Sequence, residues 1–549
     1  MAITRRLLAP VLLALVTLLA SAALPARAGA RGSGDPAVVT TDAGPVRGVL
    51  TDRGRSFLGI PFAAPPVGQL RWRPPGPVTP WTAVRDAGHF AGACAQQARP
   101  VLGTAEVTNE DCLYLNVFTP PGDSAGKPVL VWFHGGSFVS GTAAHYDASR
   151  LARAGGLVVI TANYRLGAFG FLAHPGLTAE APDSGSGDYG LLDQQAVLRW
   201  IRANAAAFGG DPANVTAAGQ SAGGLSVCGH LAAPGSRGLF ARAVIQSAAC
   251  GVAARPAAEA ASTGTSFARG AGCRGDAAEV VACLRGKPAA ELLKVKVSGA
   301  APWWPVSGTP VLPVPPGQAI AAGAHARVPV LVGSALDEGT IGTLIVESAG
   351  VRLNAVTYPI LLSTLFKRDG LRVAAQYPAS RFGNDHRRAF ATAFGDYLVS
   401  CPTQEAARQL ATATPGRVFA YEFADRSAPV LYPAPSGFPL GAYHGSEIPY
   451  LFDYLAAGEV RLDPAQTRLS QTMTGLWSRF AATGDPADWP PTQADPYVPL
   501  SLAPDAVAPR TDYDSGHQCP FWATVARPTS QGPLLAAGFG ASRSVPEGP

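Results

Sequence analysis

The sequence predicts an α/β fold with a large, mostly parallel sheet at its centre and helices on both faces. Short apolar runs end in glycine or polar turns, and runs of this kind are typical of strands that are covered on both faces. VLVWF at 129–133 and VPVLVGS at 328–334 are two of them. Helical patterns such as that over 191–208 lie between the runs. Strands and helices therefore alternate along the chain, which favours a parallel sheet.

The composition indicates one packed core. The chain has 549 residues, of which 47% are hydrophobic and 15% are charged, as is usual for globular proteins. Because no linker-like segment divides the apolar runs, we expect a single large domain with insertions over 29–526. The tail at 527–549 lacks both a clear period and a long apolar stretch, and we expect it to be poorly ordered.

The N-terminus has the pattern of an export signal. Arg5 and Arg6 precede an apolar run, and Ala-Arg-Ala at 26–28 supplies a small-x-small cleavage site. The sequence thus predicts a signal peptide over 1–28 and a secreted protein without a stable membrane anchor. The alternative is an uncleaved anchor, because the apolar run is about long enough to span a bilayer.

Charge argues against nucleic acid as a partner. Cleavage would remove three of the 43 basic residues and none of the 38 acidic ones, leaving a net charge of +2. No cluster of lysine or arginine stands out in the remainder. A nearly neutral chain without a basic patch lacks the electrostatic footprint of a nucleic-acid-binding protein.

Eight cysteines predict disulfides rather than a metal site. An even number in an exported chain favours bridges, although spacing alone leaves 105 connectivities open. No Cys-x-x-Cys pair or Cys/His cluster has the spacing of zinc ligands, so no metal is expected. The cysteines are Cys94, Cys112, Cys228, Cys250, Cys273, Cys283, Cys401 and Cys519.

A Gly-x-Ser-x-Gly pentapeptide at 219–223 makes Ser221 a candidate nucleophile. In a chain with 62 glycines the pentapeptide alone has little weight, so its surroundings decide. A predicted strand at 214–218 precedes it and a helix of small residues follows it at 222–233. A strand, a tight turn and a helix form the context in which such a serine is held strained and exposed.

The candidate base is His444, which lies in a glycine-bounded loop after the predicted strand RVFAYEF. A serine hydroxyl needs a base, and in this kind of fold the chain order is serine, acid, histidine. His386 starts a charged helical stretch and is interpreted as a solvent-facing residue. His517 precedes a cysteine and is interpreted as structural. His444 is therefore the predicted base.

Two neighbouring carboxylates are candidates for the acid that orients the base. Asp337 and Glu338 follow the strand at 328–334, at the carboxyl edge of the sheet where ligands of α/β proteins bind. Spacing does not separate the two, and aspartate is the commoner orienting residue.

The HGGS segment at 134–137 predicts an oxyanion hole. It follows the strand at 129–133, as an HGGG-type loop follows the third strand of such a sheet. The unhindered Gly135 and Gly136 amides can approach a developing oxyanion, and the Ala222 N–H adds the donor next to the nucleophile.

With these parts in place, the chain resembles the type-B carboxylesterase and cholinesterase family of α/β hydrolases, which includes lipases, and in particular its secreted bacterial members. The resemblance extends from Val38 to Trp522, nearly the whole mature chain. Its segments are FLGIPFAAPPVGQLRWRPP (57–75), EDCLYLNVFTP (110–120), HGGSF (134–138), NYRLGAFGFL (163–172), GDYGLLDQQAVLRWI (187–201), FGGDPANVTAAGQSAGG (208–224), GLFARAVIQSA (238–248), DEGT (337–340) and HGSEIPYLF (444–452).

The resemblance implies roles for several residues. The glutamate of Asp-Glu-Gly is the triad acid in this family, which favours Glu338 over Asp337. Cys228 and Cys250 remain after the pairs that the resemblance implies, and we expect a fourth bridge between them, with two free thiols as the alternative. The implied pairs are Cys94–Cys112, Cys273–Cys283 and Cys401–Cys519.

Two departures from cholinesterases bear on the substrate. The loop at 94–112 is short and lacks the tryptophan that binds choline in those enzymes, and Gln220 replaces the carboxylate before their nucleophile. Both changes remove features that attract a quaternary ammonium group. A neutral ester is therefore the expected substrate.

Three aromatic residues are candidates for an acyl pocket, although large aromatics more often belong to the core. They are Phe169, Trp303 and Trp304. Arg71 or Arg73 is expected to pair with Glu110 as a structural support.

Together these observations predict a secreted serine carboxylesterase that acts on neutral esters through an acyl-enzyme intermediate, with the triad Ser221, His444 and Glu338. No metal or organic cofactor is expected. One alternative is a lipase for longer-chain acylglycerols, which would need a mobile apolar lid. The other is a non-catalytic binding member of the same family.

Overall fold

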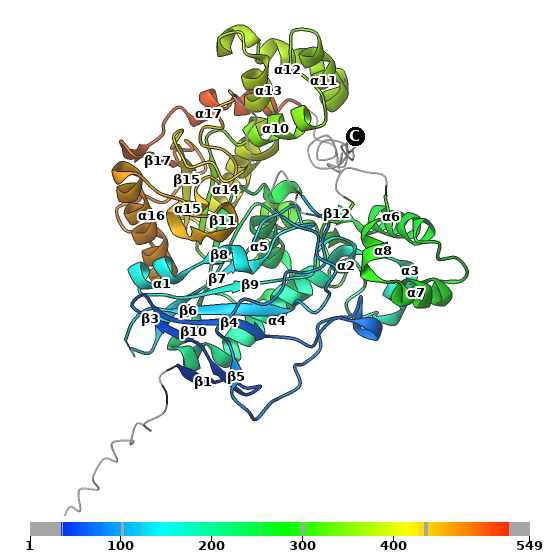
Figure 1. Cartoon of the computed structure of the whole chain (residues 1–549). Helices are drawn as coiled ribbons and strands as arrows, with labels where there is room; N and C mark the ends of the chain where they lie inside the picture. The colour runs from blue at the N-terminus through cyan, green and yellow to red at the C-terminus, as the bar shows by residue number, and fades with distance from the viewer. Residues whose placement is uncertain are drawn as a thin grey trace, which may run out of the picture. The chain divides into compact units, whose positions relative to one another are not determined.

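In the part of the chain that the structure describes, eleven strands form one mixed sheet through the centre of the fold (Figure 1). This computed structural model describes residue 35 and residues 37–99, 104–122, 124–252, 254–297, 302–432 and 437–525. The predicted signal peptide at 1–28 and tail at 527–549 lie outside those ranges. The strand order is β18 (Val507–Pro509), β17 (Leu500–Leu502), β15 (Val418–Phe423), β14 (Val330–Ala335), β11 (Arg242–Gln246), β10 (Gly210–Gln220), β7 (Lys127–Phe133), β9 (Val158–Ala162), β6 (Tyr114–Thr119), β4 (Gly54–Pro61) and β3 (Val49–Thr51).

The middle of the sheet is parallel, as the sequence predicts. All neighbours from β17 to β9 pair in parallel, whereas β18, β6, β4 and β3 add antiparallel pairs at the two edges. Every residue of β9 and β14 is buried. Their continuous apolar sequence follows from this position, since both faces of a central parallel strand are covered.

Helices cover both faces of this sheet. Alternate residues of β7 point to opposite sides: Val131 lies in the core cluster beneath α4 and α5, and Trp132 lies in the cluster beneath α1 and α16. None of the helices in the described ranges has the length and apolar character needed to cross a membrane. The helices are α1 (Ser149–Gly155), α2 (Gly167–Phe171), α3 (Pro175–Glu180), α4 (Tyr189–Asn204), α5 (Ala222–Ala232), α6 (Ala257–Gly270), α7 (Ala277–Gly286), α8 (Ala289–Leu293), α9 (Pro316–Ala321), α10 (Thr340–Ser348), α11 (Thr357–Phe366), α12 (Gly370–Gln376), α13 (His386–Gly395), α14 (Cys401–Ala413), α15 (Ile448–Leu451), α16 (Pro464–Thr483), α17 (Tyr513–Gly516) and α18 (Cys519–Trp522).

A small three-stranded sheet of β1, β2 and β5 and two strand pairs, β12 with β13 and β16 with β8, lie outside the central sheet. The pair of β8 with β16 is antiparallel and brings the segment after the HGGS loop against the segment after α15. The small strands are β1 (Val38–Thr40), β2 (Pro45–Arg47), β5 (Arg85–Asp86), β8 (Tyr146–Asp147), β12 (Arg255–Pro256), β13 (Val306–Ser307) and β16 (Asp453–Tyr454).

The helix predicted over 191–208 is present, but its boundaries differ from the predicted ones. The α-helix α4 begins earlier, at Tyr189, and ends at Asn204, after which one 3₁₀ turn continues to Phe208. Gly209 then adopts a φ of 84°, a left-handed conformation that glycine reaches without a steric penalty. The tightened last turn therefore carries the chain directly into β10.

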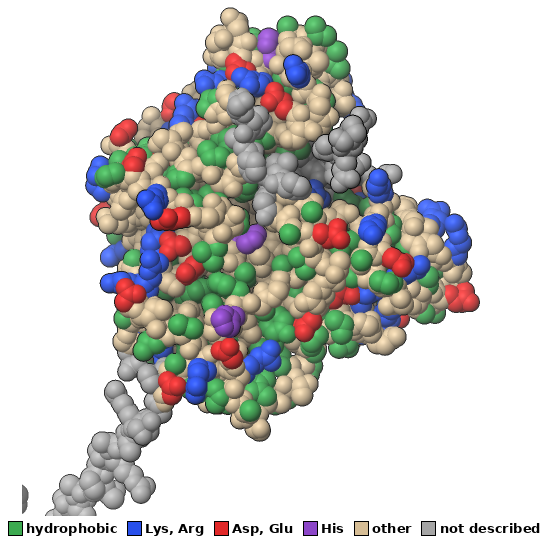
Figure 2. Space-filling model, viewed as in Figure 1, with side chains coloured by type: hydrophobic (Ala, Val, Ile, Leu, Met, Phe, Trp, Pro, Cys, Tyr) green, Lys and Arg blue, Asp and Glu red, His purple; other side chains and the backbone are tan. Residues whose placement is uncertain are grey.

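Buried ion pairs fix the loops around the sheet. Arg71 holds Glu110 through two hydrogen bonds, and Arg73 pairs with Glu180 instead. Arg165 holds the buried carboxylate of Asp193 in the same two-pronged manner, at 2.8 and 2.6 Å. In pairs of this geometry the two hydrogen bonds offset the cost of burying the charges. Removing one partner typically lowers the stability of the fold by about 3–5 kcal/mol. On the outer face in view, by contrast, acidic and basic side chains are interspersed (Figure 2).

The eight cysteines form four disulfides in the structure: Cys94–Cys112, Cys228–Cys250, Cys273–Cys283 and Cys401–Cys519. Three have the pairing that the resemblance implies. The fourth joins the middle of α5 to the 3₁₀ turn Cys250–Val252, so it ties the helix after Ser221 to the segment after β11.

Intact-mass spectrometry tests this pairing. We expect full reduction under denaturing conditions to raise the mass by about eight protons, because each of four bridges gains two. Alkylation before reduction provides the control, since it labels only thiols that are already free. A gain of six protons with two alkylated cysteines would show that Cys228 and Cys250 are not bridged.

Candidate active site

Ser221 occupies a strained turn between β10 and α5. Its φ of 56° and ψ of −124° lie outside the regions that most side chains populate. Its amide donates a hydrogen bond to the Gln246 carbonyl on the neighbouring strand β11, at 2.9 Å. Backbone strain held in place by surrounding structure is characteristic of functional sites.

The two glycines of the pentapeptide are required by close backbone contact. A Cβ atom on Gly223 would lie 1.8 Å from the Phe133 carbonyl oxygen, and one on Gly219 would lie 2.4 Å from the carbonyl carbon of Gly223. Contacts under 3 Å between such atoms do not occur without backbone movement. The turn can therefore be this tight only because both positions lack a side chain.

The buried carboxylate of Glu338 contacts the partly buried imidazole of His444. Nδ1 of His444 lies 2.6 Å from Oε2 of Glu338, and the other oxygen of that carboxylate accepts the Ala335 N–H at 2.7 Å. The strand β14 therefore holds the acid from one side and the imidazole binds it from the other. A carboxylate on Nδ1 fixes the tautomer and leaves Nε2 free to exchange protons.

Asp337, the other candidate acid, faces a different direction. Its carboxylate pairs with the Arg426 guanidinium at 2.9 Å and accepts the Ala442 N–H at 3.0 Å. The Asp337 amide in turn donates to the Ala442 carbonyl at 2.9 Å. Asp337 thus fastens the acid loop to the loop that carries His444, whereas Glu338 contacts the imidazole itself.

Opposing effects set the pKa of His444. Burial lowers the pKa of the imidazole, but the negative charge of Glu338, its hydrogen bond and the charge of Glu447 outweigh burial. The pKa of His444 is therefore raised from its usual value near 6.5. An imidazole with a raised pKa is a stronger base than free histidine.

Gln220 contacts the free nitrogen of the imidazole. Its side-chain nitrogen lies 3.3 Å from Nε2 of His444. Ser221 and His444 border the same cavities, although no hydrogen bond joins them among the contacts of the described residues. Hydrogen bonds between a nucleophile and its base commonly tighten only when substrate is bound.

The HGGS loop packs directly against Ser221. A Cβ on Gly135 would lie 3.1 Å from the Cβ of Ser221, and Gly136 has a φ of 115°. The Val139 and Ser140 amides donate to the Gly136 carbonyl. The loop therefore forms a closed turn over the nucleophile, next to Ala222 at the start of α5.

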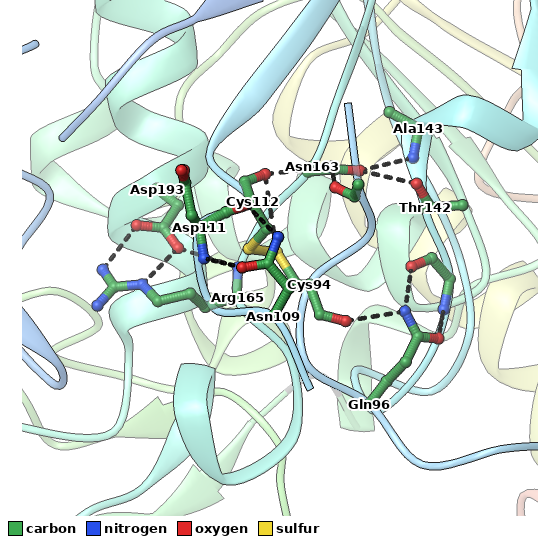
Figure 3. Close-up of a disulfide and its surroundings, with 12 residues drawn as sticks. Cys94, Gln96, Asn109, Asp111, Cys112, Thr142, Ala143, Asn163, Arg165 and Asp193 are labelled. Atoms are coloured by element: carbon green, nitrogen blue, oxygen red, sulfur yellow. Dashed lines mark hydrogen bonds and ion pairs between the residues drawn. A yellow bond between two sulfur atoms is a disulfide. The ribbon is translucent and has the colours of Figure 1, made fainter. Parts of the chain in front are cut away.

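One side chain from the first disulfide loop and one that follows β9 hold the segment after this turn (Figure 3). Gln96 donates to the carbonyls of Cys94 and Gly141 and accepts the Gly141 N–H, with all three distances between 2.9 and 3.0 Å. Asn163, after β9, donates to the Cys112 carbonyl and accepts the Ala143 N–H. The disulfide Cys94–Cys112 and the segment after the glycines are thus joined through two buried amide side chains.

Two cavities open on either side of Ser221. The apolar cavity, of about 70 Å³, is bordered mainly by Leu225, Trp304, Ile341, Phe394 and Leu398. The polar cavity, of about 60 Å³, is bordered by Thr104, His145, Gln220, Tyr432 and Tyr454, among others. Ser221 and His444 belong to the borders of both.

Of the three aromatics proposed for an acyl pocket, the structure places one at the cavities that border Ser221. Trp304 borders the apolar cavity, and its indole N–H donates to the Val252 carbonyl at 3.0 Å. Trp303 packs edge-on against Phe267, and Phe169 stacks on Trp72. The last two contacts belong to a separate core cluster, so the local sequence does not distinguish a pocket aromatic from a core aromatic.

The alternative histidines lie elsewhere. His517 is buried between the carboxylates of Asp396 and Glu422, and His386 begins α13 and packs edge-on against Tyr358. Neither borders the two cavities. Within the described ranges no group of three His, Cys, Asp or Glu side chains is arranged to hold a metal ion.

Sequence reasoning missed Glu447. This residue is buried, and one carboxylate oxygen accepts a hydrogen bond from Gln246 at 3.1 Å. Burial raises the pKa of Glu447 to about 7, and the nearby charge of Glu338 adds to the effect. The available signal was a glutamate three residues after the candidate base, but only the fold shows that the two side chains share one buried region.

The comparisons agree with this architecture. The family model described as "Carboxylesterase family" matches residues 35–522. The acetylcholinesterase of Bungarus fasciatus is 34% identical and covers 91% of this chain and 87% of its own length. The fumonisin B1 esterase of Sphingopyxis macrogoltabida is 36% identical, and the match covers 83% of this chain and 85% of that protein. A solved structure of a thermophilic PNB esterase, 32% identical, covers 88% of this chain and 99% of its own with a TM-score of 0.74.

Replacing Glu338 tests the acid–base contact. We expect Glu338→Gln to lower kcat by roughly 10⁴-fold and to move the acid limb of the kcat/KM profile to lower pH. In the parent, activity should rise as His444 loses its proton, with a midpoint above 6.5 because the pKa is raised. In the variant, burial still lowers that pKa while the attraction of the carboxylate is gone.

Asp337→Asn is the matched control for this measurement, because it makes the same chemical change one residue away. We expect it to leave the midpoint of the profile in place, since Asp337 binds Arg426 and the Ala442 amide rather than the imidazole. A midpoint that moved in the control and stayed in Glu338→Gln would contradict the assignment.

Proposed function

The chain belongs to the carboxylesterase family and has the α/β-hydrolase fold of a carboxylic-ester hydrolase, and on that premise we propose that it is a secreted serine esterase acting on uncharged esters through a Ser221–His444–Glu338 triad. The observation that carries this proposal is the 2.6 Å contact between Glu338 and His444 beside the strained serine. A signal-peptide pattern at 1–28 and four disulfides support export.

Acylation begins with attack of the Ser221 oxygen on the ester carbonyl carbon. His444 takes the hydroxyl proton on Nε2, and the imidazolium that forms is stabilised by the Glu338 carboxylate on Nδ1. Negative charge develops on the former carbonyl oxygen, and in this proposal the Gly135, Gly136 and Ala222 amides donate hydrogen bonds to it. Preorganised donors of this kind each contribute about 3 kcal/mol of transition-state stabilisation.

Deacylation repeats the chemistry with water. As the tetrahedral intermediate collapses, the His444 imidazolium passes its proton to the departing alkoxide and the acyl group stays on Ser221. The now neutral His444 accepts a proton from water, which attacks the acyl carbon. Collapse of the second intermediate returns the proton to Ser221 and releases the carboxylic acid.

From the geometry of His444 we assign the two halves of the ester, the alcohol and the acyl chain, to the two cavities. Glu338 binds Nδ1, so the departing alkoxide must lie near Nε2, which faces Gln220. Gln220 borders the polar cavity and is not on the border of the apolar one. In this proposal the alcohol occupies the polar cavity, and the acyl chain enters the apolar cavity beside Leu225 and Trp304.

Removing the nucleophile tests the proposal directly. We expect Ser221→Ala to reduce hydrolysis of p-nitrophenyl butyrate by roughly 10⁶-fold, with an unchanged circular dichroism spectrum. Ser515→Ala, at an exposed serine, should keep the parent rate. A folded Ser221→Ala protein that hydrolysed the ester at the parent rate would exclude Ser221 as the nucleophile.

Shortening Trp304 tests the location of the acyl chain. We expect Trp304→Ala to enlarge the apolar cavity and to raise the ratio of kcat/KM for p-nitrophenyl octanoate to that for the acetate by about tenfold, since each added buried methylene favours the longer chain by about 0.8 kcal/mol.

Trp303→Ala makes the same deletion at a neighbouring side chain that packs in the core. It should destabilise the protein without changing the acyl-length ratio. If both variants changed the ratio equally, the cavity beside Trp304 would not be the acyl site.

A further inference from the structure

The polar cavity contains a concentration of hydrogen-bonding groups that the ester mechanism does not use. The Thr104 hydroxyl is buried and has no partner. The His145 imidazole and the Tyr432 and Tyr454 hydroxyls also border the cavity, and among the contacts of the described residues none of the three polar groups has a hydrogen-bond partner. A buried polar group normally finds a partner, so the unpartnered Thr104 hydroxyl, with three further hydrogen-bonding groups around the same cavity, requires an explanation.

Elsewhere in the described residues, buried polar atoms without a hydrogen-bond partner occur in the packed core or at the apolar cavity. The Tyr497 hydroxyl and the Thr403 hydroxyl are examples from the core, and neither borders the two cavities. The apolar cavity has the Ser247 hydroxyl as its unpartnered buried group. The polar cavity differs because the Thr104 hydroxyl shares one space next to the nucleophile with the polar groups of His145, Tyr432 and Tyr454.

Neighbouring contacts hold these groups in place. The pairing of β8 with β16 sets Tyr454 opposite Tyr146, and the His145 ring packs edge-on against Tyr454 with ring centres 5.7 Å apart. Tyr432 packs edge-on against Tyr443 at 5.8 Å. A Cβ on Gly445 would lie 3.4 Å from the Tyr432 hydroxyl and 3.5 Å from the Gln220 side-chain nitrogen. The Tyr432 hydroxyl is therefore close to the residue that follows His444.

The chemistry of the cavity matches an uncharged hydroxyl group. Threonine and tyrosine hydroxyls each donate one hydrogen bond and accept others, and a neutral imidazole does the same through its two nitrogens. Burial lowers the pKa of His145, which keeps the ring neutral at pH 7. No carboxylate, lysine or arginine is among the described residues that border the cavity, so neither a cationic nor an anionic alcohol meets a complementary charge.

We propose that the polar cavity selects esters whose alcohol keeps at least one free hydroxyl beside the ester oxygen, and that Tyr432, Tyr454, His145 and Thr104 bind that hydroxyl. This proposal rests on the esterase function and on the assignment of the alcohol to this side of Ser221. It extends both by naming the alcohol as an uncharged polyol. A site built to hydrogen-bond a substrate hydroxyl discriminates against the analogue without it, because its own polar groups are then left unpaired.

Three butyrate esters with the same acyl chain test the proposal. Glycerol 1-monobutyrate carries two free hydroxyls, n-propyl butyrate has the same three-carbon alcohol without them, and butyrylcholine carries a cation. We measure kcat/KM for each and divide it by the rate of hydroxide-catalysed hydrolysis of the same ester, which removes differences in leaving-group reactivity. We expect the glycerol ester to exceed the propyl ester by at least roughly tenfold and the choline ester to show no preference.

Conservative variants test which side chains produce the preference for the free hydroxyl. We expect Tyr432→Phe to lower the ratio of the glycerol ester to the propyl ester by about threefold to tenfold, because the lost hydroxyl has a partner only in the glycerol ester. His145→Phe, which keeps the ring contact with Tyr454, should act in the same direction and covers the case in which the first variant fails to fold. Tyr497→Phe and Thr403→Val delete buried unpartnered hydroxyls outside the cavity and should leave the ratio unchanged.

The result separates the two levels of the proposal. If Ser221-dependent hydrolysis of p-nitrophenyl butyrate is present but the glycerol and propyl esters react equally, the hydroxyl site is refuted and the esterase function stands. A normalised preference for butyrylcholine would also refute it, in favour of aromatic binding of a cation. If p-nitrophenyl butyrate is not hydrolysed, or is hydrolysed without Ser221, the esterase proposal itself fails.

Discussion

The contact between the backbone at Gly223 and the Phe133 carbonyl is the constraint on which the site depends. The start of α5 lies so close to the end of β7 that a Cβ on Gly223 would not fit. The HGGS loop that follows β7 therefore covers Ser221. One close approach therefore brings the nucleophile and the candidate oxyanion donors together. The strained φ of Ser221 follows from this packing, as expected where surrounding structure over-determines a residue.

The acid and base depend on a second set of contacts at the same sheet edge. Both oxygens of Glu338 are engaged, one by the Ala335 amide and one by His444. Asp337 ties the two loops together through the Ala442 backbone. Adjacent carboxylates thus have separate tasks, one acting on the imidazole and the other on the loop that carries it. A buried acid with both oxygens satisfied is held in orientation as well as in charge state.

The two cavities give the site its chemical asymmetry. Side chains from α5, α10 and the segment after β11 make one side apolar, whereas hydroxyl and imidazole groups border the other. Gln220 borders the polar cavity, beside Nε2 of His444. A neutral amide at that position adds no charge to the alcohol side, which is consistent with the proposed preference for uncharged esters.

The sequence by itself determined the alternation of strands and helices, the glycine-flanked serine and the order of the candidate residues, because each of these rests on local periodicity and local turn chemistry. Spacing did not separate Glu338 from Asp337; the family resemblance favoured Glu338, and the tertiary structure shows that Glu338 contacts the imidazole. Tertiary structure alone distinguished Trp304 from Trp303 and placed Glu447 near His444. It also brought Thr104, His145, Tyr432 and Tyr454 to one cavity from four distant segments. Such groups share no local pattern, since what unites them is the space between loops that the central sheet holds together.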